Sequence, residues 1–115
     1  MSKSTMPLEK TISLLFDPKT RNLATTLLIE IKNRQDTNNP YKSNEYQQFC
    51  KKYGFEQSTY YSVLSKLREY GIVYKSGGHH EGVYRINSYF IFQLLKEWME
   101  FLGVEYSNPL KKLYR

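Results

Sequence analysis

The chain has 115 residues, of which 40% are hydrophobic and 16% aromatic, with 11 tyrosines and one tryptophan. This composition is that of a single folded domain and excludes an intrinsically disordered chain. The net charge is +6 and the pI is near 9.4. A basic excess of this size favours a polyanion as partner, the alternative being a charge that only keeps the protein soluble.

A single cysteine excludes an internal disulfide framework and a cysteine-rich zinc site, and fits a reducing compartment. No apolar run approaches the length of a membrane span, and the N-terminus lacks the apolar region of a signal peptide. We therefore expect a soluble, cytoplasmic protein. No acid–base pair of carboxylates, no nucleophile with a partnered base and no phosphate-binding glycine loop is legible, so we expect neither an enzyme nor a cofactor.

Two helices are predicted in the first third of the chain, after a polar, flexible start at residues 1–7. The first has apolar residues at helical spacing, namely Leu8, Ile12, Leu15 and Phe16. Asp17-Pro18 then interrupts the pattern, with Asp17 as the N-cap and Pro18 as the first residue of the next helix. The second helix carries its apolar face at Leu23, Leu27, Leu28 and Ile31.

The composition turns polar between residues 33 and 43, and a helix cannot continue through Asn39-Pro40. We expect a long loop here, serving as a spacer or as a partner contact. The next helix, capped by Ser43 or Asn44, has a predicted buried face of Tyr46, Phe49, Cys50 and Tyr53. Cys50 is expected to pack between two helices, and a redox-sensing thiol is the alternative.

Residues 54–73 predict a tight turn, one helix, a helix stop and the start of a strand. The apolar seam of this helix comprises Tyr60, Val63, Leu64 and Leu67. Glu56 precedes the helix, and Gly71 stands where a left-handed C-terminal cap is expected. The opposite face is polar and mostly uncharged, which suits hydrogen bonds to base edges and phosphates better than mere solvation. The predicted DNA-contacting residues on this face are Gln57, Ser58, Thr59, Tyr61, Ser62, Ser65 and Lys66.

The motif Gly-Phe-x-x-Ser-Thr-x-Tyr-x-x-Leu-x-x-Leu-x-x-x-Gly-Ile-Val at 54–73 resembles the turn and third helix of the winged helix-turn-helix transcription regulators. Residues 15–28 are similar to the first helix of the arsenic-repressor-like members of that family. The resemblance implies that the polar face enters the major groove or meets its flanking phosphates. Glu56 stands where the family usually has Ser or Thr, which weakens the expected N-cap. The high tyrosine and lysine content is similar to that of small archaeal regulators.

Two short alternating runs, 72–76 and 83–87, flank a glycine-rich segment and predict a β-hairpin. In the resembled family this hairpin is the wing, which meets the DNA backbone or minor groove. Its predicted contact residues are Lys75, His79, His80 and Arg85. The His79-His80-Glu81 cluster also invites a metal site, but adjacent side chains on a loop offer poor geometry and no further ligand is near, so no metal is expected.

Residues 88–102 predict a last helix whose apolar stripe is wider than one face of a small domain needs. We infer that this helix pairs with its copy in a two-fold dimer. The predicted dimerisation residues are Phe90, Ile91, Leu94, Leu95, Trp98, Met99 and Leu102, with Tyr89, Phe92 and Phe101 extending the stripe.

Together these patterns predict a mainly α fold with a small β-hairpin. A winged helix-turn-helix domain at 8–87 is followed by an added C-terminal dimerisation helix at 88–103 and a basic tail at 104–115. The predicted function is sequence-specific binding of double-stranded DNA as a homodimer, regulating transcription, with repression favoured over activation. The alternative is a winged helix for architectural DNA binding, in chromatin, plasmid partition or replication, or for protein contact. No effector site is legible.

Overall fold

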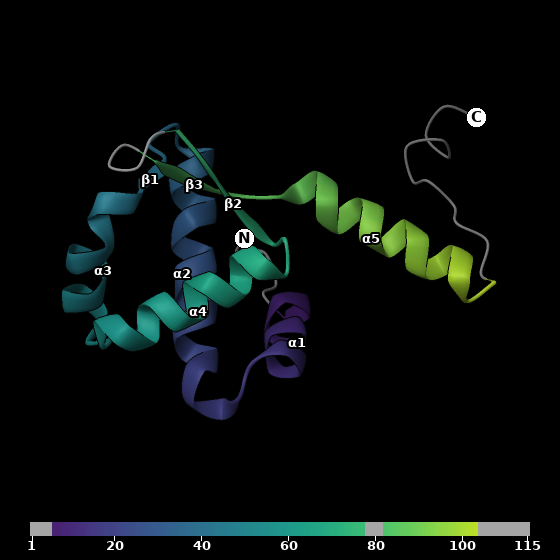
Figure 1. Ribbon diagram of the computed structural model, residues 1–115, viewed down its shortest axis with the longest axis horizontal. Coiled ribbons are helices and arrows are strands. Elements are labelled where there is room, and N and C mark those ends of the chain that lie inside the picture. Colours follow the sequence, from purple (N-terminus) through teal and green to yellow (C-terminus); the bar gives the residue numbers. More distant parts are fainter. Residues whose placement is uncertain (1–5, 78–81, 104–115) are drawn as a thin grey trace.

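The computed structural model describes residues 6–77 and 82–103, and this part of the chain is mainly helical with one small antiparallel sheet (Figure 1). The predicted mainly α fold with a β-hairpin is confirmed at that level. The helix α1 already begins at Met6, inside the predicted flexible start, and the predicted tail at 104–115 lies outside the described residues. The elements in chain order are α1 (Met6–Leu15), α2 (Pro18–Asp36), β1 (Tyr41–Lys42), the 3₁₀ turn η1 (Ser43–Glu45), α3 (Tyr46–Tyr53), α4 (Gln57–Glu69), β2 (Val73–Ser76), β3 (Val83–Ile86) and α5 (Ser88–Phe101).

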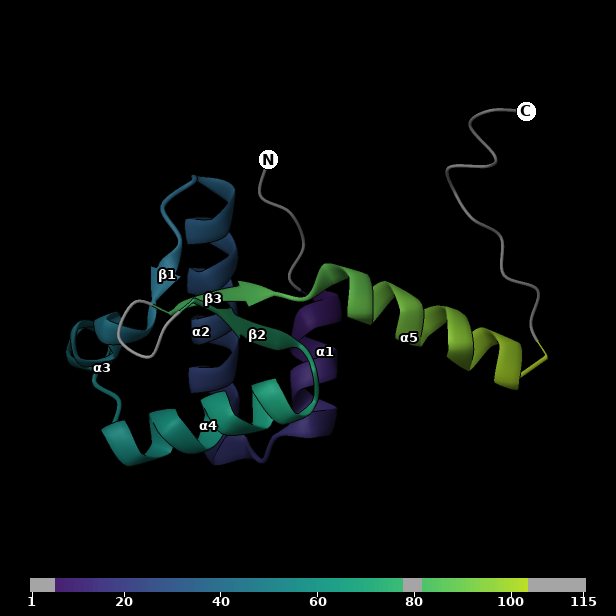
Figure 2. The same cartoon turned by 45° about the horizontal axis from the view of Figure 1, so that its top comes forward.

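The core is built around α2, against which α1, α4 and the sheet pack (Figures 1 and 2). One face of α2 is fully buried, with Leu23, Leu27 and Ile31 at 0–1% exposure. Burying a leucine or isoleucine side chain stabilises the fold by about 1.5–3 kcal/mol. All four residues of the predicted seam on α4 are buried as well. The packing against α2 therefore fixes which face of α4 points outward.

Asp17 and Pro18 separate α1 from α2 as predicted. The Asp17 carboxylate accepts from the Thr20 hydroxyl at 3.0 Å and from the Thr20 backbone N–H at 3.2 Å. These hydrogen bonds, the one from the Thr20 side chain above all, lower the pKa of Asp17. Pro18 stands at the first helical turn, where its missing N–H would have had no partner in the helix. The guanidinium of Arg21 donates to the Phe16 carbonyl at 3.0 Å, which closes the corner between the two helices.

The segment at 33–43 is not the long loop that the sequence predicted. The helix α2 covers its first part, and only residues 37–40 connect that helix to β1. Both terminal nitrogens of Arg34 donate to the Glu45 carboxylate at 2.9 Å, and its Nε donates to the Asn39 carbonyl at 2.7 Å. This bidentate ion pair joins the end of α2 to η1. The connection is consequently a short turn held by these contacts of Arg34, rather than a long spacer.

The sheet has three strands in the order β1-β3-β2, and each neighbouring pair is antiparallel. The pairing of β2 with β3 confirms the predicted hairpin. The strand β1 was missed, because two residues are too few to show alternation. It pairs Tyr41 with Tyr84, whose buried rings lie 6.3 Å apart. Through β1 the start of α3 is joined to the hairpin.

The helix α3 buries Phe49 and Cys50, as predicted. Burial raises the pKa of the Cys50 thiol, which favours packing over reactivity. The other two predicted members of the buried face differ: Tyr46 is half-buried, and Tyr53 is 40% exposed. Tyr53 is the last residue of a short helix, and its hydroxyl donates to the Glu30 carboxylate at 3.3 Å at the rim of the core.

The helix α5 leaves the sheet directly after β3 and projects away from the other elements (Figures 1 and 2). Asn87 caps it, because its side chain accepts from the Phe90 N–H at 3.1 Å. No residue of this 14-residue helix is buried. Its first turn lies beside Gly71, whose absent Cβ would stand 2.7 Å from a ring carbon of Phe90. The root of α5 thus packs on the body, and the rest extends from it.

Candidate nucleic-acid interface

The helix α4 exposes a polar face opposite its buried seam. From the 3.6-residue period, the residues that point farthest from the seam are Ser58, Ser62, Ser65 and Glu69. Thr59 is partly buried and is therefore less exposed than predicted. The other six residues predicted for this face are exposed: Gln57, Ser58, Tyr61, Ser62, Ser65 and Lys66.

A buried pair of tyrosines anchors the centre of α4. The hydroxyls of Tyr60 on α4 and Tyr41 on β1 lie 2.9 Å apart, and both residues are at most 1% exposed. Burial raises the pKa of both phenols well above the usual range, so both stay protonated at neutral pH. Phe49 of α3 completes the contact, with its ring 5.6 Å from that of Tyr60. The outward face of α4 is therefore held at a fixed angle to α3 and the sheet.

The turn between α3 and α4 is tight. Gly54 adopts a left-handed conformation with φ of 74°, and the Phe55 N–H donates to the Cys50 carbonyl at 2.9 Å. Glu56 precedes α4 without a capping hydrogen bond from its side chain, in agreement with the weak cap expected. On the exposed side, the Tyr61 ring packs against the Tyr46 ring, and the two ring centroids lie 5.2 Å apart. Partial burial raises the pKa of Tyr61, so its hydroxyl remains a hydrogen-bond donor.

The hairpin separates the two cations that the sequence assigned to it. Lys75 pairs with Tyr84 and Tyr74 pairs with Arg85, so the two cations lie on opposite faces of the sheet. The Lys75 amine lies 5.9 Å from the centre of the Tyr84 ring, on the face that also carries buried Val73. Arg85 lies on the other face with half-exposed Tyr74. Only Lys75 thus lies on the side of α4.

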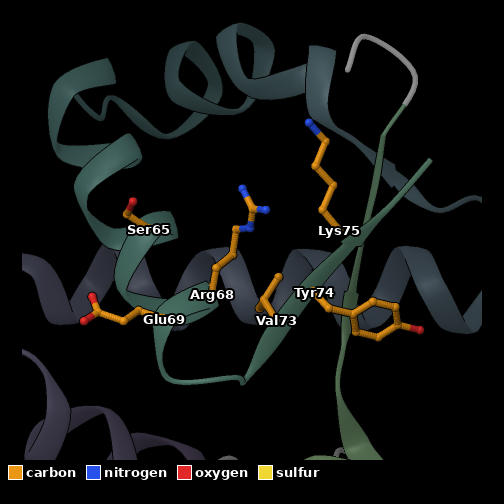
Figure 3. A pocket seen from close by; sticks show the side chains of 6 residues that line it. All are labelled: Ser65, Arg68, Glu69, Val73, Tyr74 and Lys75. Atoms are coloured by element: carbon orange, nitrogen blue, oxygen red, sulfur yellow. The ribbon is translucent and has the colours of Figure 1, made fainter. Parts of the chain in front are cut away.

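A hollow of about 510 Å³ lies between the C-terminal half of α4 and β2. Figure 3 shows Arg68 and Lys75 reaching into it from the helix and the strand, with Ser65 beside them, while Tyr74 points to the other side of the strand. The guanidinium of Arg68 also lies 5.9 Å from the Tyr84 ring, so one buried phenol borders both cations. The Glu69 carboxylate points away from them. Two cations around one hollow provide a position for an anionic group such as a phosphate.

Arg68 was not predicted from the sequence as a contact residue. A signal was present, because Tyr61, Ser65 and Arg68 follow the spacing i, i+4, i+7 along one flank of the exposed face. Lys66, which the sequence did assign, lies on the other flank of α4, 6.0 Å from the Phe16 ring. The two flanks of α4 therefore each carry a cation: Arg68 faces the hairpin and Lys66 faces the corner between α1 and α2.

The predicted wing tip, with His79, His80 and the candidate metal cluster that Glu81 would complete, lies outside the described residues. Among residues 6–77 and 82–103, no group of three His, Cys, Asp or Glu side chains could hold a metal ion. Nor is any helix in that part of the chain long and apolar enough to cross a membrane.

A protein-family model matches nearly all of the described chain. No curated protein and no solved structure matches it. Residues 5–102, from the start of α1 to the end of α5, match an archaeal family. The candidate interface on α4 and the projecting α5 both fall within that match, and the chain belongs to this archaeal family.

Proposed function

We propose that this protein is a sequence-specific, double-stranded DNA-binding regulator of transcription, built as a winged helix-turn-helix domain and acting as a homodimer. The observation that carries the proposal is the exposed face of α4, where a helix fixed by four buried residues presents small hydrogen-bonding side chains over three turns. A face that met only water would more often be charged, whereas hydroxyl and amide groups suit base edges and phosphates. The order α3, turn, α4 and antiparallel hairpin supports the same interpretation.

In the proposed complex, α4 lies in the major groove with its N-terminal half toward the bases. Gln57, Ser58 and Ser62 lie on that half and would meet base edges. Arg68 and Lys75 border the hollow beside the C-terminal half and would hold a backbone phosphate there, which sets the register. Glu69 also lines this hollow, but its carboxylate points away from the two cations.

A dimer would give this small domain its specificity, because one recognition helix reads only a few base pairs. The apolar residues of α5 are exposed and provide a surface for association. Two copies of α4 set about one DNA turn, roughly 34 Å, apart would read an inverted repeat. Occupation of such a site by the dimer would block polymerase access, so the proposed role is repression. It needs no catalysis or cofactor and would be exerted in the cytoplasm.

Architectural DNA binding is the second candidate, and one observation favours it. Apart from Glu69 at the end of the helix, the outermost side chains of α4 are serines, namely Ser58, Ser62 and Ser65. Their short hydroxyls reach phosphate oxygens as readily as bases, which would give affinity without sequence preference. The two candidates therefore differ in the ratio of specific to non-specific affinity.

Selection from random duplex DNA tests the proposal directly. The enriched pool and bulk DNA are titrated with the protein at two salt concentrations. We expect an enriched inverted repeat bound at least about a thousandfold more tightly than bulk DNA. Strong, salt-dependent binding without enrichment would favour the architectural role. Absence of binding in both pools would contradict DNA binding altogether and leave a protein-interaction module.

Cations on the two faces of the sheet allow the contact surface to be tested. We expect Arg68→Ala with Lys75→Ala to reduce the slope of log affinity against log salt by about 0.9 for each phosphate that the protein no longer neutralises. Arg85→Ala removes the same kind of charge from the opposite face of the sheet and should leave the slope unchanged. Equal flattening in both proteins would move the proposed contact away from the hollow.

A further inference from the structure

The helix α5 has the amphipathic pattern of a packed helix, although it projects from the body. Lys96 and Glu100 lie on one side of it. The apolar stripe, on the other side, spans more than 100° of the helix surface, the width of a face that normally meets a core. We define this stripe as Phe90, Ile91, Leu94, Leu95, Trp98, Phe101 and Leu102.

Exposure along the stripe is greater in its distal half than near the body. Phe90 is 36% exposed, Leu94 42%, Trp98 54% and Phe101 80%. The root of α5 is partly covered by α1, with which it shares an apolar groove, and the distal half continues the same stripe. Within the distal half, the rings of Trp98 and Phe101 meet each other edge to face at 5.8 Å. The largest exposed apolar side chains of the helix thus stand where the body no longer reaches.

The groove beside the root is the complement of this stripe. It has a volume of about 500 Å³ and is lined almost entirely by apolar atoms. Leu8, Ile12 and Leu15 of α1 form one wall, and Phe90 and Ile91 of α5 form the other. Tyr70 and Ile72, on either side of Gly71 at the end of α4, also line the groove. Groove and stripe are therefore one continuous apolar surface that shares the root of α5.

We propose that each groove receives the distal half of α5 from a second copy of this chain. A two-fold axis between Leu94 and Leu95 sets the two α5 helices antiparallel and brings each Ile91 opposite the partner subunit's Trp98. Such a contact is self-complementary, since each subunit gives a stripe and accepts one. The inference rests on the homodimer of the proposed function and adds its geometry.

Surface area favours a second copy as the occupant. The exposed parts of the stripe amount to on the order of 700 Å² per subunit, close to the roughly 800 Å² that each partner buries in a standard stable interface. Ile91, Leu94, Trp98 and Phe101 also follow the alternating spacing of three and four residues by which paired helices interlock. A small apolar molecule in the groove would leave the distal half of the stripe in water.

The contact would also fix the recognition helices relative to each other. Tyr70 and Ile72 in the groove are held to the end of α4, because their backbone N–H groups donate to the Lys66 and Leu67 carbonyls at 2.8 and 3.0 Å. The α5 helix of the partner would rest on these residues, so the spacing of the two α4 helices would follow from the seating of α5.

Molar mass from light scattering on the full chain is the first test. We expect wild type to have the mass of a dimer, and both Trp98→Glu in the stripe and Thr11→Arg in the groove to yield monomers. Leu14→Arg is the matched control, because Leu14 is 87% exposed on the side of α1 away from the groove, and it should remain dimeric. Helix content from circular dichroism should be unchanged in all three. A monomeric wild type, or dimers of Trp98→Glu or Thr11→Arg, would overturn the proposal.

Disulfide trapping tests the register in a Cys50→Ala background. Chains with Ile91→Cys and chains with Trp98→Cys are oxidised separately and as a mixture. We expect disulfide-linked dimers only in the mixture, because two copies of either residue lie about 10 Å apart along the helix axis. Links within a single variant, or none, would overturn the antiparallel seating. A dimer so linked that binds no DNA refutes DNA binding alone, whereas a DNA-binding monomer refutes the dimer and this inference and leaves DNA binding standing.

Discussion

The body of the molecule, from α1 to β3, and the helix α5 use the same kind of sequence pattern with opposite outcomes. Within the part of the chain that the structure describes, all 16 buried apolar residues lie in the body, and none lies in α5. On α2 and α4 each apolar stripe faces another element of the same chain, whereas the stripe of α5 faces outward. An amphipathic pattern thus specifies a helix and its apolar side, and it leaves open whether the covering surface belongs to the same chain.

The largest expected effect separates the two regions directly. Leu27→Ala in the body should lower the free energy of unfolding by about 2–5 kcal/mol at every protein concentration, because it opens a cavity in a fully buried site. Leu95→Ala in α5 should change it only where the dimer forms, so its effect should vanish on dilution. Urea unfolding at several protein concentrations measures both. A concentration-independent loss in Leu95→Ala would place α5 in the fold of the single chain.

The anchoring of α4 within the body gives the next largest effect. Tyr60→Phe should cost about 1–3 kcal/mol of stability, since it leaves the buried Tyr41 hydroxyl without its partner. The double variant with Tyr41→Phe should recover most of that loss, because both polar groups are then absent. Tyr61→Phe, a half-exposed neighbour, is the control and should be nearly neutral. Chemical denaturation of wild type, Tyr60→Phe, Tyr41→Phe and the double variant completes the cycle, and additive losses would show that the hydroxyls are not coupled.

The fold was largely predictable where the pattern was long. The seam of α4 and the cap at Asp17 were each predicted from several residues that indicate the same structure, and both predictions were confirmed. The strand β1 and the turn at 37–40 were not predictable, because they depend on contacts across the chain: the pairing of Tyr41 with Tyr84 and the ion pair of Arg34 with Glu45. Residues far apart in sequence leave no periodic signal.

The candidate site was predictable for its helix and less so for its hairpin. Six of the seven α4 residues predicted to be exposed are exposed, because the position of the seam fixes the opposite face. The grouping of cations was not predictable, since strand register decides that Lys75 joins Arg68 and that Arg85 lies on the other face. A shift of one residue in that register would put Lys75 and Arg85 on the same face.

Gly71, which follows α4 in the body, lies against Phe90 of α5. Its substitution should have an intermediate effect on the free energy of unfolding. Gly71→Ala forces a side chain into a left-handed conformation, at about 1–2 kcal/mol, and also pushes its Cβ against the Phe90 ring. Gly54→Ala carries the same backbone strain with open space around the Cβ. The difference in unfolding free energy between the two variants therefore measures the packing of α5 on the body. Equal losses would mean that Phe90 moves aside without cost and that the root of α5 is loosely held.

The smallest expected effect concerns the ion pair that closes the body at η1. Burial alone would raise the pKa of Glu45, but hydrogen bonds from Arg34 and from the Lys42 backbone N–H outweigh it and lower that pKa. A carboxyl group with a depressed folded pKa contributes stability above its unfolded pKa, about 4.3, and this contribution is lost as the pH falls through the folded value. Glu45→Gln should therefore cost about 1 kcal/mol at pH 7 and less at pH 3. Urea unfolding at both pH values checks this, with Glu56→Gln as the control, because the exposed Glu56 side chain caps nothing. A cost for Glu45→Gln that did not change with pH would mean that the closure of the body depends on the shape of the side chain and not on its charge.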